Sequence, residues 1–351
     1  MSQYKDISVF KRATISDALK QMDAVQKKLL LILNDDDTFY SLISIGDIQR
    51  AIIKNQPVTT PIVKILRDEV RVAHINDNPE DIKNYIRQKR NDFMPVIDAD
   101  NNIVNIIFWE DLFGEKQSVA QFNLPVVIMA GGRGSRLKPL TNVIPKPLIP
   151  INNKTIIEDI MDRFVEHGCH QFYLSVNYKA ELIRYYFDDL NNPEYSIDYF
   201  QEDKPLGTAG SLSLLNGKID QTFFVSNCDI LIDQDYSEIL KYHRENKNEI
   251  TIVAALKHYP IPYGTIETGN NGRLIELTEK PELIFKINSG MYVIEPQVLN
   301  EIPGDKFFHI TELIANVMSR GVTVGVFPVS EKSWKDIGDW KEYLKNIAYL
   351  K

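Results

Sequence analysis

Apolar and polar positions in the first third of the chain follow a pattern that occurs twice. In the first copy, the helical stretch SDALKQMD is followed by the apolar run Leu29–Leu33, the polar turn Asp35–Asp37 and a second apolar run. In the second copy, the helical stretch EDIKNYIRQKR precedes Met94–Ile97 and the turn Asp98–Asn102. Each copy predicts a helix, two strands joined by a tight turn, and an acidic step into another helix. The divergent repeat indicates a small α+β unit built twice.

Beyond Pro125 the pattern changes to short apolar runs that alternate with amphipathic stretches. The apolar runs are Val126–Met129, Phe172–Val176, Phe223–Val225 and Ile250–Ala254. The amphipathic, helical stretches are Thr155–His167 and Ala180–Leu190. Strands that alternate with helices predict βαβ units and a mainly parallel sheet. We therefore expect an α/β domain at residues 124–351, preceded by the α+β unit at residues 1–118, with the polar stretch Gln117–Leu124 as the linker.

Composition narrows the function classes. The 351 residues are 44% hydrophobic and 25% charged, which is typical of a soluble globular protein. The formal net charge of -8 disfavours nucleic-acid binding, which needs a basic surface to displace counterions. No apolar run approaches the ~20 residues of a membrane span, and the start lacks the apolar core of a signal peptide. The two cysteines, Cys169 and Cys228, form no CxxC pair, so we expect a cytoplasmic protein without a zinc site or disulfide framework.

The strongest chemical signal is the segment PVVIMAGGRGSRLKPLTNVIPKPLIP at residues 125–150. An apolar strand leads into a glycine-rich loop, and in a parallel sheet such a loop lies at the carboxyl edge, where ligands bind. Glycine lets the backbone approach a phosphate and present N–H groups to it. Arg136 can add a bidentate contact, and Lys146, between two prolines, is a point charge on a stiff segment. The expected nucleotide contacts are Ala130, Gly131, Gly132, Gly134, Ser135 and Arg136.

Two commoner phosphate-binding loops do not fit this segment. It contains neither the G-x-x-x-x-G-K-[ST] P-loop nor the G-x-G-x-x-G dinucleotide fingerprint. The strand, the GGRGSRL loop and the PKP segment together resemble the signature of the sugar nucleotidyltransferase family. That resemblance covers Pro125–Lys351 and implies a Rossmann-like nucleotide half and a sugar half.

Later segments are similar to the family's other motifs and occur in the same order. Residues 205–210 (PLGTAG) resemble the loop that lies against base and ribose, and residues 288–292 resemble the strand that closes the sugar pocket. The resemblance implies base and ribose contacts at Pro205, Gly207, Thr208 and Ala209, and sugar or sugar-phosphate contacts at Tyr263, Gly264, Glu279, Lys280 and Asn288.

Asp229 and Asp336 resemble the family's two metal ligands. Asp229 follows the strand Phe223–Val225, with Asn-Cys before it where the family usually has glycine, and Asp336 lies in a W-x-D-x-G motif. A lone aspartate at such a place more often caps a helix, but two in matching motifs favour a metal site. Mg²⁺ is the expected cofactor, since it is usually held by one or two carboxylates plus substrate phosphates. The expected catalytic set is Arg136, Lys146, Asp229, Lys280 and Asp336.

The amino-terminal repeat resembles a pair of CBS domains. In that family each unit ends in a Ser/Thr-x-x-Asp step, whose Asp holds a ribose and whose hydroxyl approaches a phosphate. Ser44 and Asp47 keep this step, whereas Phe108 replaces the hydroxyl in the second unit. The resemblance implies an adenine or guanine nucleotide at Ser44 and Asp47, although the same pair would also serve as a helix cap. Assembly into a homo-oligomer is the alternative role for this region.

The substrates are less sharply indicated than the reaction. Residues 202–210 resemble the E-x-x-P-L-G-T-A-G form of guanylyltransferases, and the Glu202 carboxylate could accept from N1–H and the 2-amino group of guanine. A CBS pair ahead of this domain resembles guanylyltransferases of legionaminic acid biosynthesis, which act on glucosamine-1-phosphate. Mannose-1-phosphate guanylyltransferase, uridylyltransferase and thymidylyltransferase activities stay open, as does a different class, a catalytically inactive nucleotide-sensing regulator.

Overall fold

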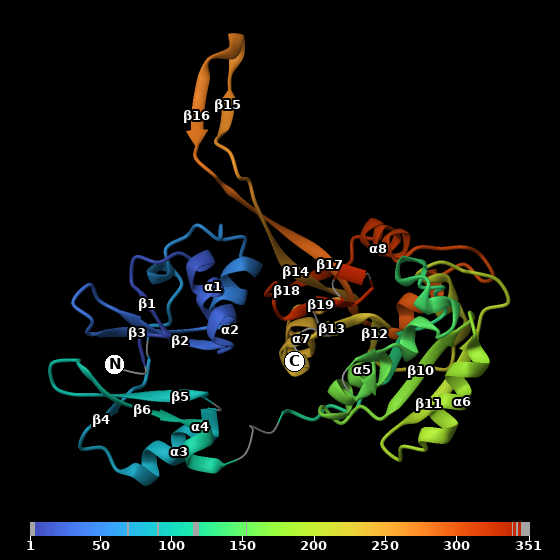
Figure 1. Cartoon of the computed structure of the whole chain (residues 1–351), viewed down its shortest axis with the longest axis horizontal. Coiled ribbons are helices and arrows are strands. Elements are labelled where there is room, and N and C mark those ends of the chain that lie inside the picture. The colour runs from blue at the N-terminus through green and yellow to red at the C-terminus, as the bar shows by residue number, and fades with distance from the viewer. Residues whose placement is uncertain are drawn as a thin grey trace. The chain divides into compact units, whose positions relative to one another are not determined.

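The computed structural model describes residues 4–68, 70–89, 91–114, 119–151, 153–338, 340–341 and 343–344. Contacts divide the chain into two compact units, Met1–Ser118 and Val119–Lys351 (Figure 1). Of the expected linker, Gln117 and Ser118 lie outside the described residues. The rest of it belongs to the second unit, because Leu124 is buried and the Phe122 ring stacks on His167 with 5.2 Å between ring centres. Phe122 and Leu124 thus pack with the second unit.

The first unit contains the predicted repeat. In each half the first strand runs parallel to the second, and the second runs antiparallel to the third. The first half consists of β1 (Ser8–Phe10), α1 (Ile15–Val25), β2 (Leu29–Leu33), β3 (Phe39–Ser44) and α2 (Ile45–Ile53). The second half consists of β4 (Ala73–His74), α3 (Pro79–Lys89), β5 (Phe93–Ile97), β6 (Ile103–Phe108) and α4 (Trp109–Phe113). The predicted order of helix, strand, strand and helix is confirmed in both halves.

Polar residues at turns and helix starts explain this local structure. Asp37 and Asn101, in the two predicted turns, have φ values of 63° and 62°, a left-handed backbone that Asp and Asn tolerate. Thr14 and Ser44 each begin a helix with a reciprocal capping box to the aspartate three residues later. Phe108 is the N-cap residue of α4 and makes no side-chain capping hydrogen bond, so α4 has no capping box.

The second unit is built on a seven-stranded sheet with the order β11-β10-β7-β12-β17-β14-β18. Only β17 runs antiparallel to its neighbours β12 and β14, and the other neighbouring pairs are parallel. The mainly parallel sheet predicted from the sequence is therefore confirmed. The strands are β7 (Val126–Met129), β10 (Gln171–Val176), β11 (Ser196–Gln201), β12 (Phe223–Asn227), β14 (Ile250–Pro260), β17 (Glu282–Ile294) and β18 (Val324–Val329).

The sheet has an apolar core on each face, because successive residues of a strand point to opposite sides. Ile128 packs on one face in a cluster with Phe164 and Ile183, and Val127 packs on the other in a cluster with Leu313. Burial of each such side chain stabilises the fold by about 1.5–3 kcal/mol. The helices that cover the first face are α5 (Ile156–Val165), α6 (Ala180–Leu190) and α7 (Tyr236–Glu245), and α8 (Ile310–Ser319) covers the second.

Short elements complete the second unit. The two-stranded pairs are β8 (Pro150–Ile151) with β9 (Lys154–Thr155), and β13 (Ile230–Ile232) with β19 (Trp334–Asp336). The 3₁₀ turns of the whole chain are η1 (Ile62–Lys64), η2 (Ser135–Leu137), η3 (Leu140–Asn142), η4 (Lys146–Leu148), η5 (Gly210–Leu215), η6 (Asn270–Gly272) and η7 (Pro296–Glu301). In the part of the chain that the structure describes, every helix is too short or too polar to cross a membrane.

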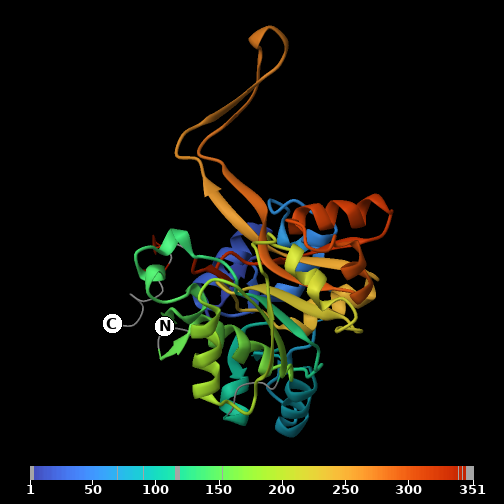
Figure 2. The ribbon, with the colours of Figure 1, turned by 90° about the vertical axis from the view of Figure 1, so that its right-hand side faces the viewer.

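Strands β14 and β17 continue beyond the sheet as a two-stranded arm, here residues 256–286 (Figures 1 and 2). Their ladder runs from Ile250 opposite Ile294 to Pro260 opposite Glu282. The outer end is a separate hairpin of β15 (Thr265–Thr268) and β16 (Leu274–Thr278). The sequence did not predict how far this arm extends.

Candidate active site

The predicted nucleotide-site residues follow strands that end at one edge of the sheet. Because β7, β10, β11 and β12 are parallel neighbours, the segments after their last residues meet there. The glycine-rich loop follows β7, Asn177 follows β10, Glu202 follows β11 and Asp229 follows β12. The structure thereby gathers residues that are far apart in the sequence.

The glycine-rich loop is held in one shape by its neighbours. Gly134 has a φ of +61°, and a Cβ atom there would lie 2.8 Å from Thr141 Cγ2 and 3.0 Å from Lys146 Cβ. The Thr141 hydroxyl donates to the carbonyl of Gly134 over 2.9 Å, which fixes the close approach. At Gly132, by contrast, an added Cβ would have no atom within 4 Å. The loop therefore leaves open space at the glycine where a phosphate would approach the backbone.

A short ladder brings the two predicted metal ligands together. β13 pairs with β19 so that Ile230 lies opposite Asp336, and the backbone N–H of Ile337 donates to the carbonyl of Asp229 over 2.9 Å. A Cβ atom on Gly338 would lie 2.5 Å from Asp229 Oδ2 and 2.7 Å from Asp336 Oδ1. Both carboxylates thus converge on Gly338, where the absence of a side chain leaves room for them.

Two cations accompany these carboxylates. The Lys146 ammonium donates to Asp229, and both residues are buried, with 9% and 7% of their surface exposed. Arg136 is half exposed and spans the pair, with its two terminal nitrogens each 3.9 Å from a carboxylate oxygen of Asp229 or Asp336. Burial raises the pKa of Asp336 above its usual value, and the charge of Asp229 adds to this rise. The cluster is a compact set of two negative and two positive groups.

This donor set fits a magnesium ion that is completed by substrate. Asp229 and Asp336 supply carboxylate oxygens, which Mg²⁺ prefers, and one or two carboxylates are its usual protein share. Among the described residues there is no group of three or more His, Cys, Asp or Glu side chains that could hold a metal alone. In this structure Lys146 and Arg136 already compensate the charges of the two carboxylates. A magnesium ion would therefore displace one of these cations from the carboxylates or share the carboxylates with it.

Glu202, the predicted base-reading residue, is buried beside the glycine-rich loop. Its Oε2 accepts the N–H of Leu206 over 2.7 Å, and its Oε1 accepts the hydroxyl of Ser175 over 3.2 Å. The same Oε1 would lie 3.2 Å from a Cβ atom on Gly131. Each oxygen keeps capacity for one further donor. Glu202 therefore both positions the PLGTAG loop and remains able to accept from a ligand.

The PLGTAG loop is tied to the segment before α8. The carbonyl of Phe308 accepts the N–H groups of both Ala209 and Gly210, and the Thr208 hydroxyl accepts the N–H of Ile310. A Cβ atom on Gly207 would lie 2.7 Å from that same carbonyl. Ala209 is fully buried, so its predicted contact with a nucleotide would have to run through its backbone. Pro205 is exposed at the rim of the loop.

Four of the five predicted sugar-side residues lie on the arm and not in the cluster. Tyr263 is 75% exposed, and a Cβ atom on Gly264 would lie 2.9 Å from Glu279 Oε2, so these residues meet one another. Met291 of β17 lies opposite Ser226 near the metal ligands, whereas Glu282 lies nine residues further along the strand. At ~3.3 Å per residue, that is about 30 Å of strand.

Lys280 is thus separated from the cluster in this conformation. In the described part of the chain, neither Lys280 nor Glu279 has a hydrogen bond or ion pair to Asp229 or Asp336. Asn288, exposed near the base of the arm, accepts the N–H of Gly290 through its side chain. The sequence analysis places Lys280 in the catalytic set with Asp229 and Asp336, but in this structure Lys280 does not contact either aspartate.

In the first unit, Ser44 and Asp47 form the capping box of α2. Arg67 donates to both, over 2.7 Å from Nε to Asp47 Oδ1 and 2.7 Å from Nη2 to Ser44 Oγ. Burial alone would raise the pKa of Asp47, but hydrogen bonds from Arg67 and Ser44 hold it below its usual value. A cavity of about 360 Å³ lies beside Asp47, and its lining includes four cations, Arg50, Lys54, Lys64 and Arg67.

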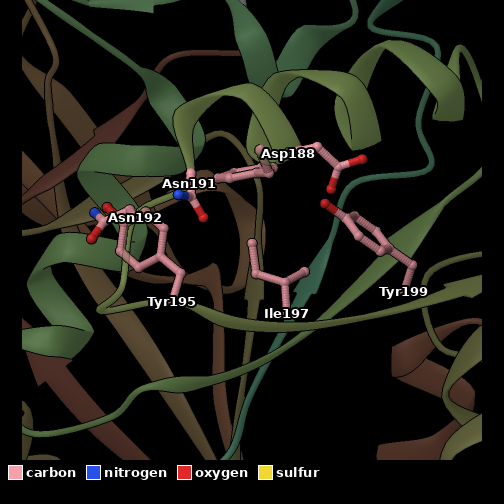
Figure 3. A pocket seen from close by; sticks show the side chains of 7 residues that line it. Asp188, Asn191, Asn192, Tyr195, Ile197 and Tyr199 are labelled. Carbon is pink, nitrogen blue, oxygen red and sulfur yellow. The ribbon is translucent and has the colours of Figure 1, made fainter.

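Sequence reasoning missed several supporting residues. Ser175 and Asn177, at the end of β10, hold Glu202 through its side chain and its backbone carbonyl. Their place after a parallel strand was the available signal. A separate cavity of about 290 Å³ between α6 and β11 is lined by residues such as Asp188 and Tyr199 and contains none of the predicted site residues (Figure 3).

Comparisons with known proteins agree on the second unit. The family model described as "Nucleotidyl transferase" matches residues 125–351. "UTP--glucose-1-phosphate uridylyltransferase" of Synechocystis sp. is 32% identical over 243 residues, covering 64% of this chain and 62% of that protein. "Mannose-1-phosphate guanylyltransferase catalytic subunit beta" of Dictyostelium discoideum is 31% identical over 231 residues, covering 64% of each chain. The chain therefore spans less than two thirds of the length of these relatives.

Solved structures give the same result. The crystal structure of HddC from Yersinia pseudotuberculosis superposes with a TM-score of 0.52 at 26% identity, over 65% of this chain and all of that chain. A putative glucose-1-phosphate thymidylyltransferase from Bacillus anthracis, at 21% identity and a TM-score of 0.52, shares the fold over 64% of this chain and 94% of its own.

Proposed function

We propose, because this chain belongs to the nucleotidyl transferase family, that it transfers a nucleotidyl group from an NTP to a sugar 1-phosphate and releases pyrophosphate. The observation that carries the proposal is the convergence of Arg136, Lys146, Asp229 and Asp336 beside the glycine-rich loop. Two cationic side chains, Arg136 and Lys146, beside an open glycine backbone are suited to hold and align a triphosphate, and a magnesium ion on the two carboxylates would add the remaining positive charge.

The nucleophile in this reaction is an oxygen of the sugar phosphate. It forms a new bond to the α-phosphorus of the NTP while the bond from that phosphorus to the β-phosphate oxygen breaks, and pyrophosphate leaves. A phosphate monoester is already anionic at neutral pH, so no protein base is needed. Mg²⁺ held by Asp229 and Asp336 would supply further neutralisation of the reacting phosphates.

The protein's own contribution is positioning and charge. The open backbone at Gly132 receives a phosphate, and Arg136, half exposed at the edge of the cluster, can turn its guanidinium toward the triphosphate. Lys146 is fixed by burial and by Asp229, so its charge is pre-oriented. Such preorganised charges stabilise the transition state without reorganisation at the moment of reaction.

The proposed base is guanine. Glu202 lies beside Gly131 with capacity for two more donors, which is what N1–H and the 2-amino group of guanine offer. Guanylyltransferases are among the relatives at 31% identity, but so is a uridylyltransferase at 32%. The resemblance of the whole chain to enzymes of legionaminic acid biosynthesis supports glucosamine-1-phosphate as the sugar substrate. Mannose-1-phosphate is the second candidate.

The sugar-side roles of Tyr263, Gly264, Glu279, Lys280 and Asn288 belong to this proposal as well. These residues carry the motif order of the family, although four of them lie on the arm and the fifth at its base. For these residues to contact a sugar phosphate, the arm must lie closer to the Asp229–Asp336 cluster than it does in this structure.

The first unit is proposed to be a CBS pair that binds an adenine or guanine nucleotide. The cavity beside Asp47 has the size for a nucleotide and the cations for its phosphates. Arg67 now occupies both hydrogen-bonding groups of the Ser44–Asp47 step, so a ribose must displace it. Helix capping by the same two residues is the competing role, and both roles are compatible with the contacts.

A matrix of NTPs against sugar 1-phosphates, with Mg²⁺ and a pyrophosphate readout, tests the proposal. We expect turnover with GTP and glucosamine-1-phosphate, and its loss in Asp229→Asn. Asp198→Asn, an exposed carboxylate on β11, is the matched control and should retain activity. Absence of pyrophosphate release for every pair would favour the catalytically inactive regulator instead.

A further inference from the structure

The segment that joins Arg136 to Lys146 makes a short turn whose last carbonyls lie beyond its own hydrogen bonds. The turn is η3, and the N–H of Val143 at its end donates to the carbonyl of Leu140 at its start. The last carbonyls of a helical turn have no partner within that turn. The carbonyls of residues 141–143 are therefore available to donors from another part of the chain.

Two consecutive residues between β10 and α6 supply these donors. The Tyr178 hydroxyl donates to the carbonyl of Thr141 over 3.1 Å. The Lys179 ammonium donates to the carbonyls of Asn142 and Val143, over 2.6 Å in each case. The same ammonium lies 5.5 Å from the centre of the Tyr178 ring, so the two side chains also contact each other. Three successive carbonyls are thus held by residues 36–37 positions away in the sequence.

The contacts continue from Thr141 to the glycine-rich loop. Thr141 is buried, its hydroxyl donates to the carbonyl of Gly134, and its Cγ2 occupies the space that a Cβ atom on Gly134 would need. Gly134 stands two positions before Arg136, and Val143 stands three positions before Lys146. The held segment therefore lies directly between the two cations proposed to act on the triphosphate.

Lys179 occupies a position that its own local structure disfavours. It is the N-cap residue of α6 with φ 55° and ψ 38°, and its side chain makes no capping hydrogen bond. This left-handed backbone is costly for a residue other than Gly, Asn or Asp. A positive charge at the start of a helix also opposes the helix dipole. A residue that breaks local preferences in this way points to a role elsewhere, and here its side chain reaches the carbonyls of residues 142 and 143.

We propose that Tyr178 and Lys179 are positioning residues for nucleotidyl transfer. They hold the backbone of residues 141–143 and, through Thr141, fix the glycine-rich loop in the shape that receives the triphosphate. The inference rests on the proposed function, because it assigns these residues a part in that reaction. They act through the loop and not on the substrate, since their hydrogen bonds go to backbone carbonyls. A loop displaced by about 1 Å costs up to ~100-fold in rate.

Hydrogen–deuterium exchange on the full chain tests the structural part without any substrate. In Lys179→Met, the amides of residues 134–144 should exchange at least ~10-fold faster than in the wild type, because the donor to two carbonyls is gone. Lys241→Met, which changes an exposed lysine on α7, is the matched control and should leave these amides unchanged. The amides of β7 should be unchanged in both variants. Unchanged exchange at residues 134–144, or faster exchange that extends to β7, overturns the proposal.

Steady-state kinetics of pyrophosphate release test the catalytic part. Lys179→Met should lower kcat by ~10–100-fold and change the KM for the NTP less than threefold, because a misplaced loop loses contacts that matter most in the transition state. Lys179→Arg keeps N–H donors for both carbonyls and should restore at least about half of the lost activity. Lys241→Met should match the wild type. A change confined to KM, or no rescue by Lys179→Arg, contradicts a positioning role.

A double-variant comparison tests the route through Thr141. Thr141→Val removes the hydroxyl that donates to Gly134 and keeps a methyl group beside it. If both residues act along one series of contacts, adding Thr141→Val to Lys179→Met should lower kcat by less than about twofold further, whereas independent effects multiply. Losses that multiply overturn the proposed route. A wild type without turnover for any pair of NTP and sugar 1-phosphate contradicts the proposed function, and the exchange measurement still decides whether Tyr178 and Lys179 fix the loop.

Discussion

Replacing Lys146 by Met should destabilise the second unit, and a second substitution should restore most of the loss. Lys146 and Asp229 are a buried pair with 9% and 7% exposure, so removing the ammonium leaves a carboxylate in a low-dielectric site. Removal of one partner from such a pair costs about 3–5 kcal/mol. Arg136, 3.9 Å from Asp229 and half exposed, compensates part of that charge, so we expect about 3 kcal/mol.

The double variant Lys146→Met/Asp229→Asn separates structure from catalysis. With both charges gone, no uncompensated carboxylate remains, and stability should return to within about 1 kcal/mol of the wild type. Activity should not return, because the proposed metal ligand is lost. The pair of measurements therefore distinguishes a catalytic role of these residues from a purely structural one.

The assay is urea unfolding followed by tryptophan fluorescence. Two of the three tryptophans, Trp334 and Trp340, lie in the second unit, so a Trp109→Phe background makes the signal report that unit alone. With a slope of about 2–3 kcal/mol/M, the single variant should unfold at ~1–1.5 M lower urea. A Lys146→Met protein as stable as the wild type, or a double variant no more stable than the single one, would refute this reasoning.

Three further outcomes are expected. Gly338→Ala should lower kcat by at least ~100-fold, since its Cβ would lie 2.5 Å from Asp229 Oδ2, whereas Gly304→Ala, with no atom within 4 Å, should be silent in the same assay. Thiol titration at pH 8 should find Cys169 and Cys228 unreactive until the protein unfolds, because burial raises the pKa of each thiol to about 12. Asp47→Asn should cost about 1–3 kcal/mol at pH 7. Because folding lowers the pKa of Asp47, that difference should shrink as pH falls below the unfolded value of ~3.9, and an unchanged difference at pH 3 would contradict it.

The sequence located four of the seven strands of the main sheet and, among the described residues of the second unit, two of the four α-helices, because their signals are local. The predicted strand Val126–Met129 and helix Ala180–Leu190 coincide with β7 and α6, where short apolar runs and a clear 3.6-residue period end at polar residues. The run Ile250–Ala254 was less informative. It belongs to an 11-residue strand, whose outer half, residues 256–260, is paired only with β17.

The sequence motifs identified individual residues of the site, but they did not predict which of these residues contact one another. The pairing of β13 with β19 brings Asp229 and Asp336 together, which no local pattern near either residue indicates. The tie between the PLGTAG loop and Phe308 is equally long-range, and so are the supports at Ser175 and Asn177. The separation of Lys280 from the cluster depends on the length and direction of a ladder, and these follow from tertiary pairing rather than from composition.

The three-rung ladder of β13 and β19 also sets when the active site can first exist. Asp229 and Asp336 stand 107 positions apart in the chain. At a synthesis rate of ~5–20 residues per second, Asp336 is added roughly 5–20 s after Asp229. During that interval Lys146 and Asp229 can already pair, so a growing chain can hold its buried charges neutral before the second carboxylate arrives. The glycine-rich half of the site is thus expected to mature first, with catalytic competence as one of the last properties the chain acquires.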